Sequence, residues 1–279
     1  MRILSTLVSL AVIGGGLWWV DGHYPSLKYI ALEKINTAQV LSLEIKYTPK
    51  QIIDHNKGEL LRSTKHKCQS HDLKFAPYLL MEVKYSKNAA QTGEGVILWD
   101  MTDGEMVMNT KHWEKTHGYG DCITTHASSQ DFGIINELVK KGGVCDQNTL
   151  LQTLNIENDP LDTTIDACKR KKLIVQIGQR YRLHMAGAKF TKEPETLITS
   201  PLVTTTHSAG ERLTKRFSAA QIKKNAQAAF GSEFAIKSAT EIFLPFYSIT
   251  VEHPDGTLQT TFWNAVTGTP LSINLVLGK

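Results

Sequence analysis

Several residue types are scarce in this sequence, and each scarcity excludes a class of protein. Four cysteines in 279 residues are too few for a disulfide scaffold, and 9 prolines with 20 glycines exclude collagen-like and proline-rich chains. The net charge of +4 is small for a dedicated nucleic-acid binder. Only one long uncharged run is present, so the chain is no multispan channel. With 41% hydrophobic and 21% charged residues, the chain as a whole has the composition of a globular protein of two or three domains.

The one long uncharged run is residues 3–20, which follows Arg2 and ends with Trp18 and Trp19. As a helix it would span about 27 Å, close to the hydrocarbon thickness of a bilayer. The sequence predicts that residues 1–22 are a transmembrane anchor, with a cleaved signal sequence or a buried core helix as alternatives. Arg2 favours an N-terminus inside and the bulk of the chain outside the cytoplasm, periplasmic in a Gram-negative bacterium or secreted if the segment is cleaved. Residues 23–39 read as a juxtamembrane segment.

Residues 40–127 have the pattern of an α+β domain. The stretch 40–47 alternates apolar and polar residues as a half-buried strand does, and Thr48 with Pro49 has the form of a helix N-cap and first turn. Another strand is expected over 78–85. A hairpin is expected over 95–109, with Asp103-Gly104 at its tip. The acidic residues around this tip could bind a cation or be solvated.

Residues 128–187 read as three helices and a hairpin. Ser129 is expected to cap the first helix and Asp146 the second, and the third begins near Pro160. The hairpin joins 173–177 to 180–183. This order of elements resembles a winged helix. The resemblance implies a DNA-binding or protein-interaction module.

Residues 188–217, with scattered proline and threonine, read as a linker. The segment 218–279 begins with a helix over 219–230 capped by Ser218, followed by strands over 234–242, 246–252 and 257–264. A helix followed by strands with the turns His253-Pro-Asp-Gly256 and Asn264-Ala-Val-Thr-Gly268 resembles the PepSY-type modules of secreted and membrane-tethered bacterial proteins. That resemblance implies protein interaction or peptidase inhibition, and no catalytic residue.

Two clusters of histidine and cysteine stand out in the first domain. Cys68, His71, Cys122 and His126 could supply a tetrahedral zinc site, although their spacing matches no established finger. A Cys68–Cys122 disulfide or two unbonded thiols are the alternatives. No other cofactor is expected.

The remaining cysteines leave similar alternatives open. Cys145 and Cys168 fall on helices that pack together in a winged helix, so they could form a disulfide or stay core thiols. Cys122 is also a candidate nucleophile, with His117 or His126 as its base.

Acidic residues decide the interpretation of the winged-helix-like domain. In DNA-binding relatives the start of the third helix enters the major groove. Here that region carries the four carboxylates Glu157, Asp159, Asp162 and Asp166, which would repel phosphates. The sequence therefore argues against specific nucleic-acid binding.

Together these patterns predict a membrane-anchored, non-catalytic α+β protein that binds an unidentified protein partner outside the cytoplasm and contacts the membrane through residues 3–20. One alternative is a membrane-tethered DNA-binding regulator that uses the winged-helix-like domain. A second is a secreted enzyme that uses the Cys/His-rich first domain.

Overall fold

A computed structural model describes residues 40–271 of the chain, except residues 64, 89–90, 156, 200–201 and 208–210. The predicted anchor (1–22) and juxtamembrane segment (23–39) lie outside the described residues. In the part that is described, no helix combines the length and apolar character needed to cross a membrane. Nearly all described residues belong to one unit, 41–205 with 210–279.

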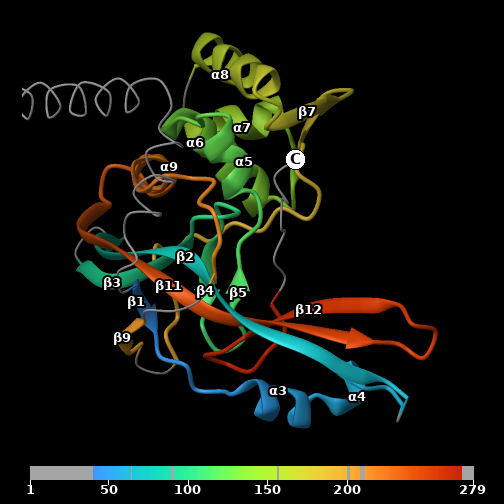
Figure 1. The fold of residues 1–279 in the computed structure, drawn as a ribbon. Helices are drawn as coiled ribbons and strands as arrows, with labels where there is room; N and C mark the ends of the chain where they lie inside the picture. The colour runs from blue at the N-terminus through green and yellow to red at the C-terminus, as the bar shows by residue number, and fades with distance from the viewer. Residues whose placement is uncertain are drawn as a thin grey trace, which may run out of the picture. The chain divides into compact units, whose positions relative to one another are not determined.

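The unit is α+β, as predicted. Two long antiparallel strands form the centre of its main sheet, β2 (Lys67–Asn88) and β11 (Ala235–Glu252), which run side by side in Figure 1. Both are longer than the sequence predicts, because β11 continues through Pro245 and β2 through Pro77. The segments predicted as separate domains, 40–127 and 218–279, therefore share one sheet.

The remaining strands of this sheet lie outside the central pair. The described order is β5-β4-β3-β2-β11-β1-β9, with β12 on β11 and β10 on β2. Their bounds are β1 (Val40–Leu43), β3 (Gln91–Asp100), β4 (Met106–Asn109), β5 (Glu114–Lys115), β9 (Thr204–His207), β10 (Glu211–Arg212) and β12 (Leu258–Asn264).

The β2–β3 and β11–β12 hairpins repeat one construction. In the first, Leu79 lies opposite Trp99, and in the second Tyr247 lies opposite Trp263. Both tryptophans are buried, at 0% and 1% exposure. In the β2–β11 pairing, Ala76 lies opposite Leu244. Leu79 and Tyr247 lie equally far along their strands from this pair, so an approximate twofold axis through it relates the two hairpins. The sheet is thus built from two similar halves.

The turn after each tryptophan is also repeated. The Asp100 amide donates to the Glu105 carbonyl (2.9 Å), and the Asn264 amide donates to the Thr269 carbonyl (2.9 Å). A glycine with positive φ completes each turn, Gly104 at 82° and Gly268 at 72°. A side chain is strained at such φ values, which is why both halves use glycine there.

Each half is tied to the turn of the other. Arg216 and Phe217 donate their amides to the Met101 carbonyl of the first turn (2.9 and 3.0 Å). In the same way, Lys46 and Tyr47 donate to the Ala265 carbonyl of the second turn (3.0 and 2.9 Å).

These bonds explain how proline fits in both central strands. Met101 donates to the Pro77 carbonyl, and Ala265 to the Pro245 carbonyl, both at 3.0 Å. In a regular ladder the amide of residue 77 or 245 would return a bond to the Met101 or Ala265 carbonyl. Proline has no such amide, and the other half's donors replace it.

The helix that follows each of these segments has the same start. Thr48 and Ser218 each form a capping box with a glutamine three residues later, Gln51 and Gln221. The helices are α3 (Pro49–His55), which continues into α4 (Lys57–Leu60), and α9 (Ala219–Phe230). The predicted caps Thr48 and Ser218 are confirmed.

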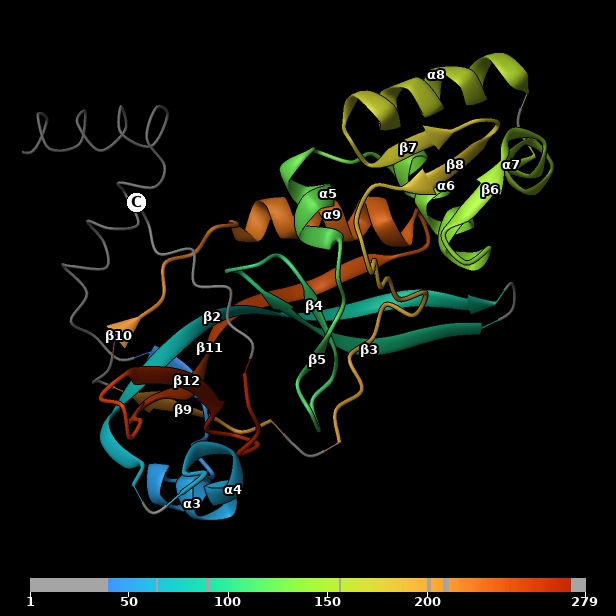
Figure 2. The same ribbon diagram turned by 90° about the vertical axis from the view of Figure 1, so that its right-hand side faces the viewer.

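Each helix covers the hairpin of the other half. Ile52 of α3 is fully buried in a cluster with Ile249 and Trp263 of the second hairpin. Ile222 of α9 is fully buried in a cluster with Met81 and Trp99 of the first. Figure 2 shows α9 beside α5 (Tyr119–Thr124), far along the sheet from α3 and α4. The two halves are therefore interlocked and share one fold.

The segment 128–187 follows the predicted order of elements. A three-stranded sheet of order β6-β8-β7 packs with three helices. Ser128, not Ser129, caps the first helix, because its side chain accepts from the Asp131 amide and the box is completed from Asp131. Asp146 caps the second helix as predicted. The bounds are α6 (Ser129–Lys140), β6 (Val144–Asp146), α7 (Gln147–Leu154), α8 (Asn158–Arg170), β7 (Ile174–Ile177) and β8 (Arg180–Leu183).

Candidate interaction groove

The four residues of the predicted zinc site lie on two different elements. Cys68 and His71 are exposed on β2, whereas Cys122 is buried in α5 and His126 follows that helix. Across the described residues, which include all four, no three histidine, cysteine or acidic side chains come together as a metal site would require. Proximity in sequence within each pair did not bring the two pairs together.

Cys122 and His126 do share a small cavity with Asn225 of α9. It measures about 30 Å³, room for a water molecule and too little for a substrate. Asn225 is 4% exposed, and neither amide atom has a hydrogen-bond partner in the described structure. A buried amide of this kind needs a partner, and a water in the cavity would supply it.

The cysteines form no disulfide, and the candidate nucleophile Cys122 is not activated. All four cysteines are unbonded in the structure, so neither the Cys68–Cys122 nor the Cys145–Cys168 disulfide is present. Burial, with Glu105, Asp121 and Asp131 nearby, raises the pKa of Cys122 well above its ordinary value. A nucleophilic cysteine needs the opposite shift.

The acidic turn at the hairpin tip is neutralised from within. Lys115 forms ion pairs with Asp100 (3.0 Å) and Asp103. Burial and the Asp100 carboxylate nevertheless raise the pKa of Asp103 to about 6. Glu105 accepts the amides of Gly118 and Gly120 at the start of α5 (2.8 and 3.0 Å). These carboxylates therefore stabilise the turn and the start of α5, and Lys115 supplies the positive charge next to Asp100 and Asp103.

The segment predicted as a linker contains an ordered part, residues 189–199, which we call the strap. Thr196, 2% exposed, donates its amide to the Val96 carbonyl (2.8 Å). Its hydroxyl accepts from the Leu98 amide (2.9 Å) and donates to the Val107 carbonyl (2.7 Å), bridging β3 and β4. The strap is thus hydrogen-bonded to both β3 and β4 in the first half of the sheet.

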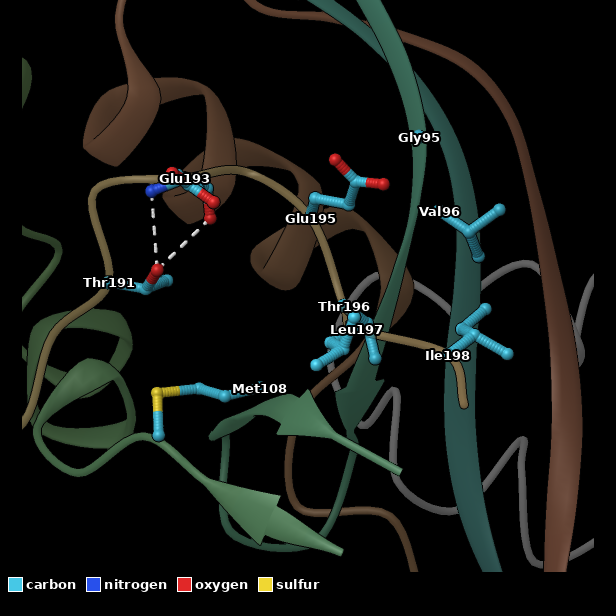
Figure 3. Close-up of a pocket in the computed structure, with 9 residues that line it drawn as sticks. All are labelled: Gly95, Val96, Met108, Thr191, Glu193, Glu195, Thr196, Leu197 and Ile198. Atoms are coloured by element: carbon cyan, nitrogen blue, oxygen red, sulfur yellow. Dashed lines mark hydrogen bonds between the residues drawn. The ribbon is translucent and has the colours of Figure 1, made fainter. Parts of the chain in front are cut away.

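A groove of about 440 Å³ lies between the strap and these strands, within the usual range for a ligand pocket. Figure 3 shows Glu193 and Glu195 along one side, with Met108 and Leu197 toward the other. Leu197 is 58% exposed, a large fraction for a leucine. The groove therefore offers negative charge beside an uncovered apolar surface.

Glu195 is held in place by two features of neighbouring strands. The Tyr85 hydroxyl donates to its Oε2 at 2.6 Å, a short charge-assisted bond. Gly95 leaves room for its stem, because a Cβ there would lie 3.0 Å from the Glu195 Cγ and Cδ. Burial of the Tyr85 ring and the Glu195 carboxylate raise the pKa of Tyr85 to about 12, so the phenol stays a donor.

The groove carboxylates have no basic partner among the residues described: neither Glu193 nor Glu195 forms an ion pair. Glu193 is part of a local turn. Its amide donates a hydrogen bond to Thr191 Oγ1 (3.2 Å), and that hydroxyl donates to the Glu193 carbonyl (3.1 Å). Chemically, the groove can accept a cationic donor next to an aliphatic side chain. Sequence reasoning missed it, although Glu193-Pro-Glu195 in the linker was a visible signal.

The carboxylates of α8 lie where the sequence placed them. Glu157, Asp159, Asp162 and Asp166 are all exposed, with Asp162 accepting from Gln147 (2.6 Å) and Asp166 paired to Lys169 (2.8 Å). The exposed part of this helix is therefore acidic at its beginning.

Comparison with known proteins gives no significant match: no family model matches the chain, no characterised protein matches its sequence, and no solved structure matches its fold.

Proposed function

We propose that this is a non-catalytic interaction protein, tethered through residues 3–20 with its bulk outside the cytoplasm, whose strap groove binds an extended segment of a protein partner. The segment would place an arginine or lysine beside Glu193 and Glu195 and an aliphatic side chain against Leu197. The observation that carries the proposal is Glu195, a carboxylate fixed by Tyr85 and unpaired with any described cation. The resemblances to PepSY-type and winged-helix modules are compatible with this function.

The choice of a basic partner follows from the charge of the groove. A guanidinium matches a carboxylate with two parallel hydrogen bonds, and the partly apolar surroundings strengthen that pairing. Specificity would come from the spacing between cation and aliphatic group. An acidic or nucleic-acid ligand would be repelled by the same two side chains.

A peptide-display selection on the full chain tests the proposal. We expect enriched peptides that carry Lys or Arg within a few residues of Ile, Leu or Val. Binding should weaken by at least about tenfold in Glu195→Gln, the loss of one charged hydrogen-bond partner. Glu233→Gln, which removes an exposed glutamate elsewhere, is the matched control and should bind normally.

Two results would contradict the proposal. One is enrichment with no basic residues. The other is binding that Glu195→Gln leaves unchanged.

A further inference from the structure

The described residues include few exposed large hydrophobic side chains, and two of them lie on one face of the β6-β8-β7 sheet. Ile177, 57% exposed, lies opposite Arg180, and Val144, 38% exposed, lies opposite Arg182. Residues directly opposite each other in an antiparallel pair project from the same face, with Cβ atoms about 5 Å apart. This face therefore places arginine beside uncovered aliphatic groups.

The end of this sheet is a tight hairpin. Gly178 and Gln179 connect β7 to β8, with Gly178 at a φ of 61°. We call Ile177–Arg180 the wing tip. Among the described residues neither Arg180 nor Arg182 forms an ion pair. Hydrogen bonds from Thr149 hold the pKa of Asp146 below its ordinary value, and Arg180 adds a smaller effect.

The wing tip has the chemistry that the strap groove is proposed to bind. It presents a guanidinium and an isoleucine side by side, whereas the groove presents Glu193 and Glu195 beside Leu197. Asp146 lies opposite Arg180, but its two carboxylate oxygens accept hydrogen bonds from Thr149. Within the described residues the arginines and the two glutamates form no ion pair, and Ile177 and Leu197 are similarly exposed. The wing tip projects from the molecule at the end of β7 (Figure 1), whereas the binding surface by the strap is a groove, so a convex surface would meet a concave one.

We infer that the occupant of the strap groove is the wing tip of a second copy of this chain. This inference rests on the proposed function of the groove. Arg180 of one copy would pair with Glu195 of the next, and Ile177 would cover Leu197. Because the two surfaces differ, the contact is head-to-tail and leaves one wing tip and one groove free at the ends of each assembly. A contact of one hairpin with one groove is small, so association should be weak and concentration-dependent.

Sedimentation velocity of the full chain over a range of concentrations tests this inference. We expect the wild type to grow beyond a dimer as concentration rises. Arg180→Glu and Glu195→Arg should each raise the apparent dissociation constant by at least about tenfold. The chain carrying both changes should associate again, since the charges are then exchanged. Arg170→Glu, the same charge change on an exposed residue of α8, should behave like the wild type.

Circular dichroism and thermal melting of each variant separate loss of association from loss of fold. The inference is overturned if the wild type stays monomeric throughout, if the double variant does not recover, or if Arg170→Glu acts as strongly as Arg180→Glu. A monomeric wild type that still binds the selected basic peptides through Glu195 would overturn this inference alone. Loss of both results would overturn the proposed function as well.

Discussion

The two halves of the sheet share a plan and differ in what surrounds it. In each, a capped helix is followed by a long hairpin, a buried tryptophan and a glycine turn. In the first half the chain then continues into α5, the β6-β8-β7 unit and the strap, whereas the described chain ends seven residues after Asn264 in the second. The strap groove and the wing tip both belong to these segments after the first half, which have no counterpart after the second half in the described chain. The shared elements thus make the fold, and the differences carry the proposed interaction.

The outer edges of the two hairpins illustrate this contrast. On β3, the Val96 carbonyl and the Leu98 amide are bonded by Thr196 of the strap. On β12, Leu271 donates to the Phe262 carbonyl, but within the described residues no strap lies beyond it. The extended strap on the first edge forms one wall of the groove.

The largest effect is expected from the two tryptophans. Trp99→Ala and Trp263→Ala each remove a side chain with almost no exposed surface, which costs about 3–5 kcal/mol in the free energy of unfolding. The Trp99→Ala change should lower the free energy of unfolding more than Trp263→Ala. Residues of α5, α6 and α9 pack in the cluster of Trp99, whereas the cluster of Trp263 contains residues of the shorter helices α3 and α4. Urea denaturation of both variants measures the difference. Equal losses would show that the coverings of the two halves contribute equally.

A double-mutant cycle tests the exchange of helices between halves. Ile52→Ala should cost about 2–5 kcal/mol, since the side chain is fully buried. Combined with Ile249→Ala of the second hairpin, it should deviate from additivity by about 0.5–3 kcal/mol, because both lie in one cluster. Combined with Met81→Ala of the first hairpin, it should be additive. The reverse pattern would mean that each helix covers its own hairpin.

A smaller, pH-dependent effect should distinguish the two turns. The pKa of Asp103 rises from its ordinary 3.8 to about 6 in the folded chain, so the native state binds more protons between these values. This contribution to stability is present at low pH and is lost as pH rises from about 4 to about 6. The equivalent position of the second turn is Thr267, which does not titrate.

Replacing Asp103 with asparagine should therefore flatten the pH dependence of unfolding over that window, as measured by denaturation at a series of pH values. Asp255→Asn is a control of opposite sign. A hydrogen bond from the Thr257 side chain lowers the pKa of Asp255, so its contribution is present above the ordinary pKa and is lost as pH falls. If the pH dependence of unfolding is unchanged in Asp103→Asn, another member of the ion-pair group of Lys115 binds the proton.

Local signals in the sequence predicted most elements correctly. Capping residues, hydrophobic periodicity and Asp-Gly turns depend on neighbours within a few residues, so Thr48, Asp146 and Ser218 were placed as the structure has them. The repeat was also present in the sequence, as Trp99-Asp-x-x-x-Gly104 and Trp263-Asn-x-x-x-Gly268. It was overlooked because so few positions are shared.

Strand lengths and the strap depend on hydrogen bonds between residues far apart in the sequence. The predicted strand 78–85 starts after Pro77, and the predicted strands 234–242 and 246–252 leave a gap that contains Pro245. In the structure both strands continue through the proline, because amides donated by the other half replace the missing bonds. The strap read as a linker because its partners, Val96 and Leu98, are about a hundred residues earlier in the chain. No local pattern reports a hydrogen bond of that separation.

By itself, the sequence determined the α+β class, the helix starts and the hairpin turns, because each depends on the conformational preferences of a few adjacent residues. Only the tertiary structure decided that the first and last segments share one sheet, that each helix covers the other half's hairpin, and that Cys68 lies apart from Cys122. It also decided that Glu195 is held by Tyr85 near the exposed Leu197, with no ion pair among the described residues. These outcomes depend on which distant surfaces bury one another, and burial is a property of the assembled chain.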